Sequence, residues 1–159
     1  MRSLLRCLAM MAFLTSPLST ARADDTAEVA GRPIQSGITH ELTSKVMGDV
    51  RQINVWLPPG HEKAKEGYTV LYLLDGALDQ DFHHIAGLAQ LGSLSWTFGP
   101  LMVVGVQTRE RRAELTSRPT DPRYLAAFPE SGDAERFRRF LRDEVFPFVE
   151  QRYPAGKGQ

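Results

Sequence analysis

The sequence has a single cysteine, Cys7, and no long hydrophobic run. One cysteine cannot form an intrachain disulfide, so the fold must be stabilised by a packed core. Its apolar stretches are far shorter than the roughly 20 residues of a bilayer-spanning helix, which excludes a transmembrane helix of the ordinary kind. The 19 basic residues balance the 19 acidic ones. This balance argues against a nucleic-acid partner, because nucleic-acid-binding domains are usually strongly basic.

Several motifs that carry chemistry are also absent. The sequence has no Gly-x-Gly-x-x-Gly and no phosphate-binding P-loop, so we expect no nucleotide cofactor. It has no Gly-x-Ser-x-Gly, the tight turn that exposes a nucleophilic serine in one large class of hydrolases. The last histidine is His84, whereas in that class the order is serine, then acid, then histidine. A complete triad of this type therefore cannot be assembled from this chain, and we expect no catalytic residue in it.

The N-terminus has the pattern of a secretory signal peptide over residues 1–23. Arg2 and Arg6 precede the apolar run 7–14, and the small-residue triplet 21–23 ends the segment. We expect cleavage after Ala23 and a periplasmic or secreted protein that has no membrane attachment after cleavage. The mature chain of 136 residues would carry 16 basic and 19 acidic residues, a net charge of −3.

The rest of the chain predicts an α/β fold that follows a flexible leader over residues 24–37. Residues 38–47 and 51–57 favour two antiparallel strands, because a Gly-Asp turn signal separates them and the second alternates apolar with polar side chains. The nearly continuous apolar runs 69–74 and 101–106 are typical of strands that are covered on both faces in a parallel sheet. We therefore expect one domain over residues 38–159, with a hairpin that leads into a mostly parallel sheet.

Helical spacing of apolar residues predicts two helices that cover this sheet. The first spans residues 79–91 as a crossover helix, with Gly92 as its stop. A long polar loop follows from Gln107 to about Gly132, and loops of that length are often functional. The second helix runs from an N-cap at Asp133 to residue 153, with a kink between residues 144 and 147 because Pro147 lies inside the pattern.

Two segments at strand ends are candidates for a ligand crevice, since α/β folds bind ligands at the carboxyl ends of their parallel strands. In Asp75-Gly76-Ala77, the amides of Gly76 and Ala77 could face a developing oxyanion, or the segment could be a tight exit turn only. The arginine-rich run 109–114 could bind an anionic substrate or be a solvated loop. We take Asp75, Arg111 and Arg112 as crevice candidates.

The histidine pair 83–84 invites a metal site or a general base. No set of Asp, Glu or Cys residues with the spacing of metal ligands accompanies the pair, so we predict no metal site. A surface role is the simpler interpretation. His83 stays a crevice candidate, because a histidine near Asp75 would respond to changes of charge near neutral pH.

Five segments, taken in order and spacing, resemble the putative esterase family of α/β-hydrolases, which includes esterase D-like and enterobactin or siderophore esterases. The segments are Val-Leu-Tyr-Leu-Leu-Asp-Gly at 70–76, Phe-His-His-Ile-Ala-Gly at 82–87, Pro-Leu-Met-Val-Val-Gly-Val at 100–106, Glu-Arg-Arg-Ala-Glu-Leu-Thr at 110–116 and the amphipathic helix 137–153. The resemblance covers about residues 38–153.

This resemblance implies serine hydrolysis of a small-molecule carboxylic ester, with Gly76 and Ala77 at the positions of the family's oxyanion hole. Ala113 stands where the family often has an arginine or another polar residue, which puts that loop's substrate contacts in doubt. In the family the nucleophile turn follows the helix, so we expect an N-terminal portion of the fold that is truncated before the turn and inactive alone. The alternatives are a non-catalytic binding remnant, or half of a split esterase that a complementing C-terminal polypeptide completes.

Overall fold

The computed structural model describes residues 31–61, 67–97 and 99–156 of the chain. The predicted signal peptide and its cleavage site lie outside the described residues, as does the first half of the predicted leader, residues 24–30. Residues 31–37, which belong to that leader, have no regular secondary structure. The description below concerns the compact unit that spans residues 34–159.

Four strands form one sheet in the order β1-β2-β4-β3. Strands β1 (Ile38–Ser44) and β2 (Asp49–Trp56) form the predicted antiparallel hairpin. β2 also pairs antiparallel with β4 (Leu101–Val106), and β4 pairs parallel with β3 (Thr69–Leu74). The predicted plan, a hairpin that leads into parallel strands, is confirmed.

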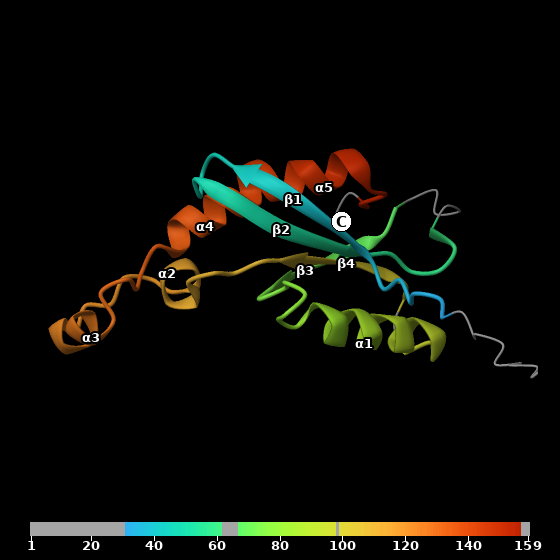
Figure 1. Ribbon diagram of the computed structural model, residues 1–159, viewed down its shortest axis with the longest axis horizontal. Coiled ribbons are helices and arrows are strands. Elements are labelled where there is room, and N and C mark those ends of the chain that lie inside the picture. The colour runs from blue at the N-terminus through green and yellow to red at the C-terminus, as the bar shows by residue number, and fades with distance from the viewer. Residues whose placement is uncertain (1–30, 62–66, 98, 157–159) are drawn as a thin grey trace, which may run out of the picture. The chain divides into compact units, whose positions relative to one another are not determined.

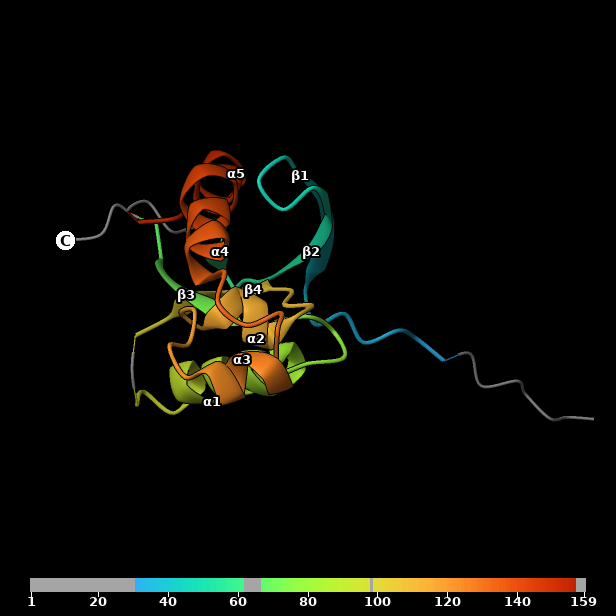
Figure 2. The same cartoon turned by 90° about the vertical axis from the view of Figure 1, so that its left-hand side faces the viewer.

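Helices cover both faces of this sheet (Figure 1). The crossover helix α1 (Phe82–Leu94) covers one face, and α4 (Ala134–Phe140) and α5 (Phe146–Arg152) cover the other. Figure 2 shows the same arrangement from the side. One core cluster joins α1 to the sheet through Phe82, Ala86, Ala89, Trp56 and Val103, and a larger cluster lies on the opposite face. Because β2 lies between two strands and has helices over both faces, its residues 53–56 are all buried rather than alternately buried and exposed.

Strand β3 is less covered than its apolar sequence suggests. Leu71 and Leu74 are 41% and 38% exposed. Within the part of the chain that the structure describes, β4 flanks β3 on one side, and only a parallel bridge between Tyr68 and Ala155 is present on the other. Each face of the strand is thus only partly covered: Val70 and Tyr72 pack against one core cluster and Leu73 packs against the other. An apolar run of this kind is typical of a strand that has a neighbouring strand on each side. The sequence pattern alone does not show which neighbouring strands are present.

The first predicted helix is shifted along the chain. Helix α1 begins at Phe82, later than expected, and continues to Leu94, so that Gly92 is buried inside it instead of ending it. Asp75-Gly76 and the residues up to Asp81 form the turn that connects β3 to this helix. None of the helices in the described ranges is long and apolar enough to cross a bilayer.

The second predicted helix is continuous but changes its winding. After α4, a π-helical turn, η2 (Leu141–Val145), leads into α5, and this change lies at the predicted kink. Pro147 then falls in the first turn of α5, where its missing N–H costs little. Asp133 occupies the N-cap position of α4, but its side chain makes no capping hydrogen bond.

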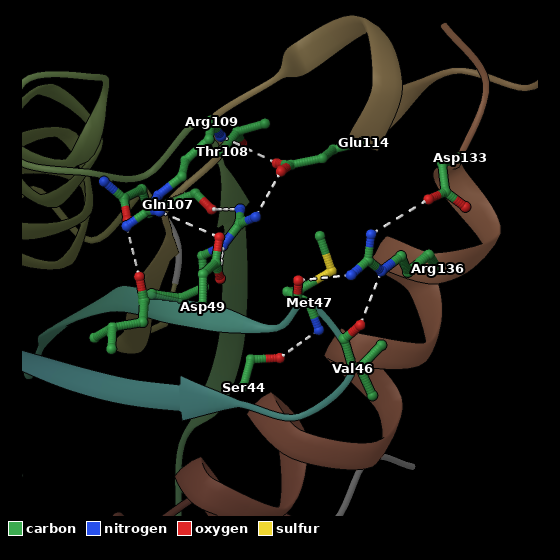
Figure 3. A network of polar contacts seen from close by, with 12 residues as sticks. Ser44, Val46, Met47, Asp49, Gln107, Thr108, Arg109, Glu114, Asp133 and Arg136 are labelled. Carbon is green, nitrogen blue, oxygen red and sulfur yellow. Dashed lines mark hydrogen bonds and ion pairs between the residues drawn. The ribbon is translucent and has the colours of Figure 1, made fainter. Parts of the chain in front are cut away.

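This helical run also holds the turn of the hairpin. The carboxylate of Glu144 accepts hydrogen bonds from the Ser44 hydroxyl and from the backbone N–H groups of Lys45 and Val46. Arg136 donates to the carbonyl oxygens of Val46 and Met47 at 2.8 and 2.6 Å, as Figure 3 shows. Segments about 90 residues apart in sequence are thereby joined, which fixes the hairpin against the helix.

Residues 107–132 are not the structureless loop that the sequence predicts. They contain two short helices, α2 (Arg111–Leu115) and α3 (Pro122–Ala127). Asp121 caps α3 by accepting the N–H of Arg123, and Pro122 occupies its first position, which is a favourable start for a helix. Figure 1 shows both helices beyond the end of the sheet at which β4 ends.

Candidate functional site

The candidate crevice lies where β3 and β4 end side by side. Leu74 and Val106, the last residues of the two parallel strands, are partners in the register. The loops that leave the strands, residues 75–81 and 107–110, therefore begin at the same level of one sheet edge. This is the edge at which α/β folds bind ligands.

Two glycines let the first of these loops lie directly on β4. A side-chain carbon added at Gly76 would stand 2.4 Å from the Cα of Gly105, and one added at Gly105 would stand 2.3 Å from the Gly76 oxygen. The backbone N–H of Gly76 donates to the Val106 oxygen at 3.0 Å, and the buried Asn54 side chain donates to the Gly76 oxygen at 2.8 Å. The close approach that Gly76 permits is thus an approach to the neighbouring strand.

Several other polar groups of this loop are also paired. Asp75 adopts a left-handed backbone with a φ of 55°, a conformation that aspartate tolerates better than most residues, and its N–H donates to the Thr108 hydroxyl at 3.0 Å. The N–H of Ala77 donates to the side-chain oxygen of Gln80 at 2.9 Å, and the Gln80 side-chain amide donates to the Thr108 carbonyl at 2.8 Å. Both candidate oxyanion amides, of Gly76 and Ala77, therefore have acceptors inside the protein in this structure.

An exposed ion pair connects the loop to helix α2. Nε of Arg111 lies 2.7 Å from a carboxylate oxygen of Asp75, and the Arg111 side chain is 75% exposed. The hydrogen bond to Asp75, together with its negative charge, raises the pKa of Arg111 above the ordinary value. Because water screens such a pair, it orients α2 more than it stabilises the fold.

Arg111 and Arg112 line one groove of about 560 Å³, together with Arg109, Thr116 and Tyr124. The guanidinium of Arg112 lies 4.1 Å from the centre of the Phe128 ring, and Tyr124 packs on the same ring with centroids 5.0 Å apart. The structure thus brings Asp75, Arg111 and Arg112 to one surface. Its cations and aromatic rings suit a ligand that has negative charge or an aromatic group.

A buried network of charges holds the backbone that carries these arginines (Figure 3). Arg51 of β2 is 3% exposed and Glu114 of α2 is 6% exposed, and their side chains meet at 2.8 Å. Asp49 pairs with Arg51 at 2.7 Å and with Arg109 at 3.2 Å, and the second Glu114 oxygen accepts the N–H of Arg109 at 3.0 Å. Burial pulls the pKa of Arg51 down, but the bonds to Glu114 and Asp49 outweigh it and leave that pKa raised.

His83 lies apart from the groups that meet at the groove. It is exposed, its ring nitrogen Nδ1 is 3.2 Å from the Ser36 hydroxyl, and its ring packs edge-on against Phe82. Within the described ranges, no group of three or more His, Cys, Asp and Glu side chains could hold a metal ion.

The sequence analysis missed Gln80, Thr108, Arg51 and Glu114. Each is an ordinary polar residue in the sequence, and its role depends on partners 28 to 63 residues away. One signal was available for Arg51, because strand periodicity places it on the same face as the apolar residues Ile53 and Val55. A charged residue at such a position is seldom buried unless it is paired.

Comparison with known families identifies the fold and its relatives. Residues 44–159 match the model of a family described as "Putative esterase". The chain belongs to this family. A search of the curated proteins finds no match for the chain.

Among solved structures, the chain is similar to an IroE-like serine hydrolase from Shewanella oneidensis, with 28% identity and a TM-score of 0.60 over 75% of this chain and 39% of that one. It is also similar to the BES protein from Bacillus cereus, with 23% identity and a TM-score of 0.66 over 84% and 52%. The siderophore hydrolase EstB from Aspergillus nidulans has 18% identity and a TM-score of 0.63 over 82% and 47%. This esterase-family chain thus spans about two fifths to one half of these proteins.

Proposed function

We propose that this chain supplies the N-terminal part of an exported serine hydrolase that cleaves carboxylic esters. The observation that carries the proposal is the family match over residues 44–159. The sheet order and the similarity to a serine hydrolase at 28% identity support it. Export rests on the signal-peptide pattern of residues 1–23.

In this proposal the chain provides the scaffold and one wall of the substrate crevice. Ala77 donates its N–H to the ester carbonyl oxygen as negative charge develops on it, which is the usual task of an oxyanion hole. Gly76 sets the backbone path that presents this amide. The serine, the acid and the histidine come from other residues, since the sequence has no Gly-x-Ser-x-Gly and no histidine after His84.

The lining of the groove beside α2 supports a proposal for the substrate class. Arg109, Arg111 and Arg112 line it together with one acid, Glu110. Asp49 and Asp75 partly neutralise two of these arginines, so the site favours a modest negative charge rather than a highly charged polymer. We propose a small-molecule ester that carries an anionic or aromatic group.

A turnover assay with p-nitrophenyl acetate and butyrate tests the proposal. We expect residues 24–159 alone to release no p-nitrophenol above a heat-inactivated control. We expect activity when the polypeptide encoded downstream of residue 159 is supplied, either in the same reading frame or as a second gene, and loss of that activity when its nucleophilic serine is changed to alanine. Activity only with a separate gene supports a split enzyme.

Two other results contradict the proposal, one from this assay and one from the gene sequence. Turnover by residues 24–159 alone would require a nucleophile that the sequence analysis has not identified. A downstream sequence with no Gly-x-Ser-x-Gly in either arrangement would favour the remaining alternative, a non-catalytic protein that binds a ligand through the groove.

A further inference from the structure

The side chain of Gln80 makes an unusual set of contacts at the proposed oxyanion site. Its oxygen Oε1 accepts the N–H of Ala77 at 2.9 Å and is 3.5 Å from the N–H of Thr108, which also points toward it. Its amide Nε2 donates to the Thr108 carbonyl at 2.8 Å. One carboxamide thus contacts backbone groups from the ends of both parallel strands.

The two amides that face Gln80 Oε1 form the kind of donor pair that binds a carbonyl oxygen. They come from different loops, one after β3 and one after β4, and they converge on a single oxygen atom. Ala77 has no exposed surface and Thr108 is 4% exposed, so water competes little for these donors. A buried N–H that loses its acceptor is costly, so some acceptor must occupy this position at all times.

We propose that Gln80 is a positioning residue whose side-chain oxygen occupies the place of the ester carbonyl oxygen until substrate binds. The oxygen holds the Ala77 amide in its orientation and is displaced by the substrate. This inference rests on the proposed function, because it assigns the Ala77 amide to the ester oxygen.

Such an internal occupant would favour the transition state over the ground state. A neutral ester oxygen is no better an acceptor than the carboxamide oxygen that it replaces, so the exchange gains little for bound substrate. A tetrahedral oxyanion accepts charge-assisted hydrogen bonds, which are roughly twice as strong as neutral ones. The gain from displacing Gln80 therefore appears mainly as the oxyanion forms, and only such differential binding accelerates a reaction.

Amide hydrogen exchange of the mature chain, measured by NMR, tests the first part of this inference. Gln80→Met keeps the length and approximate volume of the side chain but removes both polar groups. We expect exchange at the Ala77 amide to accelerate by at least about tenfold, as befits a buried amide without its acceptor, while the β4 amides keep their protection. The matched control is Gln90→Met at an exposed position of α1. It should change neither the exchange of the Ala77 amide nor the protection of the β4 amides.

Ligand titration tests the second part. With Gln80→Ala, which empties the position, we expect methyl butyrate, a neutral ester, to shift the Ala77 amide resonance saturably at concentrations at least about tenfold lower than with the unchanged chain. Unaltered Ala77 exchange in Gln80→Met would overturn the inference. Loss of the resonances of residues 75–81 in both variants would also overturn it, because Gln80 would then be purely structural. An absence of ester binding by Gln80→Ala would do the same. Neither measurement requires turnover, so failure here is distinguishable from failure of the proposed activity.

Discussion

The buried ion pair between Arg51 and Glu114 gives the most quantitative prediction. Both side chains are almost inaccessible to water, and their charged atoms are 2.8 Å apart. Removing one partner of a buried pair typically costs about 3–5 kcal/mol, because the other charge is left without compensation. Arg51 would keep Asp49 at 2.7 Å, so we expect Glu114→Leu to lower the free energy of unfolding by about 3 kcal/mol, the low end of that range.

A double variant separates the lost attraction from the cost of a stranded charge. Arg51→Met combined with Glu114→Leu removes both charges and leaves apolar side chains that can pack under α2. Replacing a whole buried pair by apolar residues is often neutral or stabilising, so we expect this variant to be at least about 2 kcal/mol more stable than Glu114→Leu alone. The backbone N–H of Arg109 still loses its acceptor, which keeps the double variant slightly below the natural chain in stability.

Urea unfolding of the mature chain, followed by circular dichroism, measures these differences. With a slope of about 2 kcal/mol per molar urea, a loss of about 3 kcal/mol moves the midpoint by about 1.5 M. Glu130→Gln, at an exposed position, is the control and should leave the midpoint unchanged. If Glu114→Leu shifts the midpoint no more than Glu130→Gln does, the network does not hold α2 as the structure indicates.

Three further predictions concern strand β4, His40 and the predicted signal peptide. Gly105→Ala should destabilise the fold by at least about 2 kcal/mol, measured by urea unfolding, because its methyl group would overlap the Gly76 carbonyl. Burial and the nearby Arg152 lower the pKa of His40, whose ring forms a hydrogen bond with the Tyr153 hydroxyl. Because the unfolded chain therefore binds a proton at this residue more readily than the folded chain, thermal stability should fall as the pH drops below about 6.5. Residues 1–23, fused to a leaderless alkaline phosphatase in a Gram-negative host, should direct periplasmic activity, with the N-terminus of the processed protein beginning after Ala23.

Each of these has a matched control. Gly87→Ala, on α1 where an added methyl group meets nothing within 4 Å, should be tolerated, and an equal loss for both glycines would contradict the packing argument. His40→Gln should flatten the stability profile between pH 7.5 and 5.5, whereas His84→Gln, at an exposed position, should not. An acidic residue introduced into the apolar run 7–14 should abolish export, and export that persists would exclude a signal peptide of this kind.

The α/β architecture could be predicted because its signals are local. Alternation over residues 51–57, continuous apolar runs at 69–74 and 101–106 and helical spacing after Asp133 each reflect how neighbouring residues share a face. Element ends were less predictable. Helix α1 starts at Phe82 because the preceding residues are held in the loop by Gln80, which bonds to Ala77 and to the distant Thr108. The contact with Thr108 joins residues 28 positions apart, so local spacing does not record it.

The candidate site shows the same division. The crevice edge could be located from the sequence, since Asp75-Gly76 ends one buried strand and the arginine run follows another. The hydrogen bonds and ion pairs at this edge could not be predicted from the sequence. That Arg111 contacts Asp75, that His83 lies beside Ser36, and that Gln80 bonds to Thr108 all depend on which strands lie side by side.

The sequence by itself determined the fold class, the predicted export signal and the absence of a serine-nucleophile motif, because each is recorded in the order and spacing of residues along the chain. Only the tertiary structure decided which polar groups meet at the sheet edge and how deeply the Arg51–Glu114 pair is buried. The physical reason is that hydrogen bonds and ion pairs act over about 3 Å in space. Residues as far apart as Arg51 and Glu114 come within that distance only when the sheet has formed.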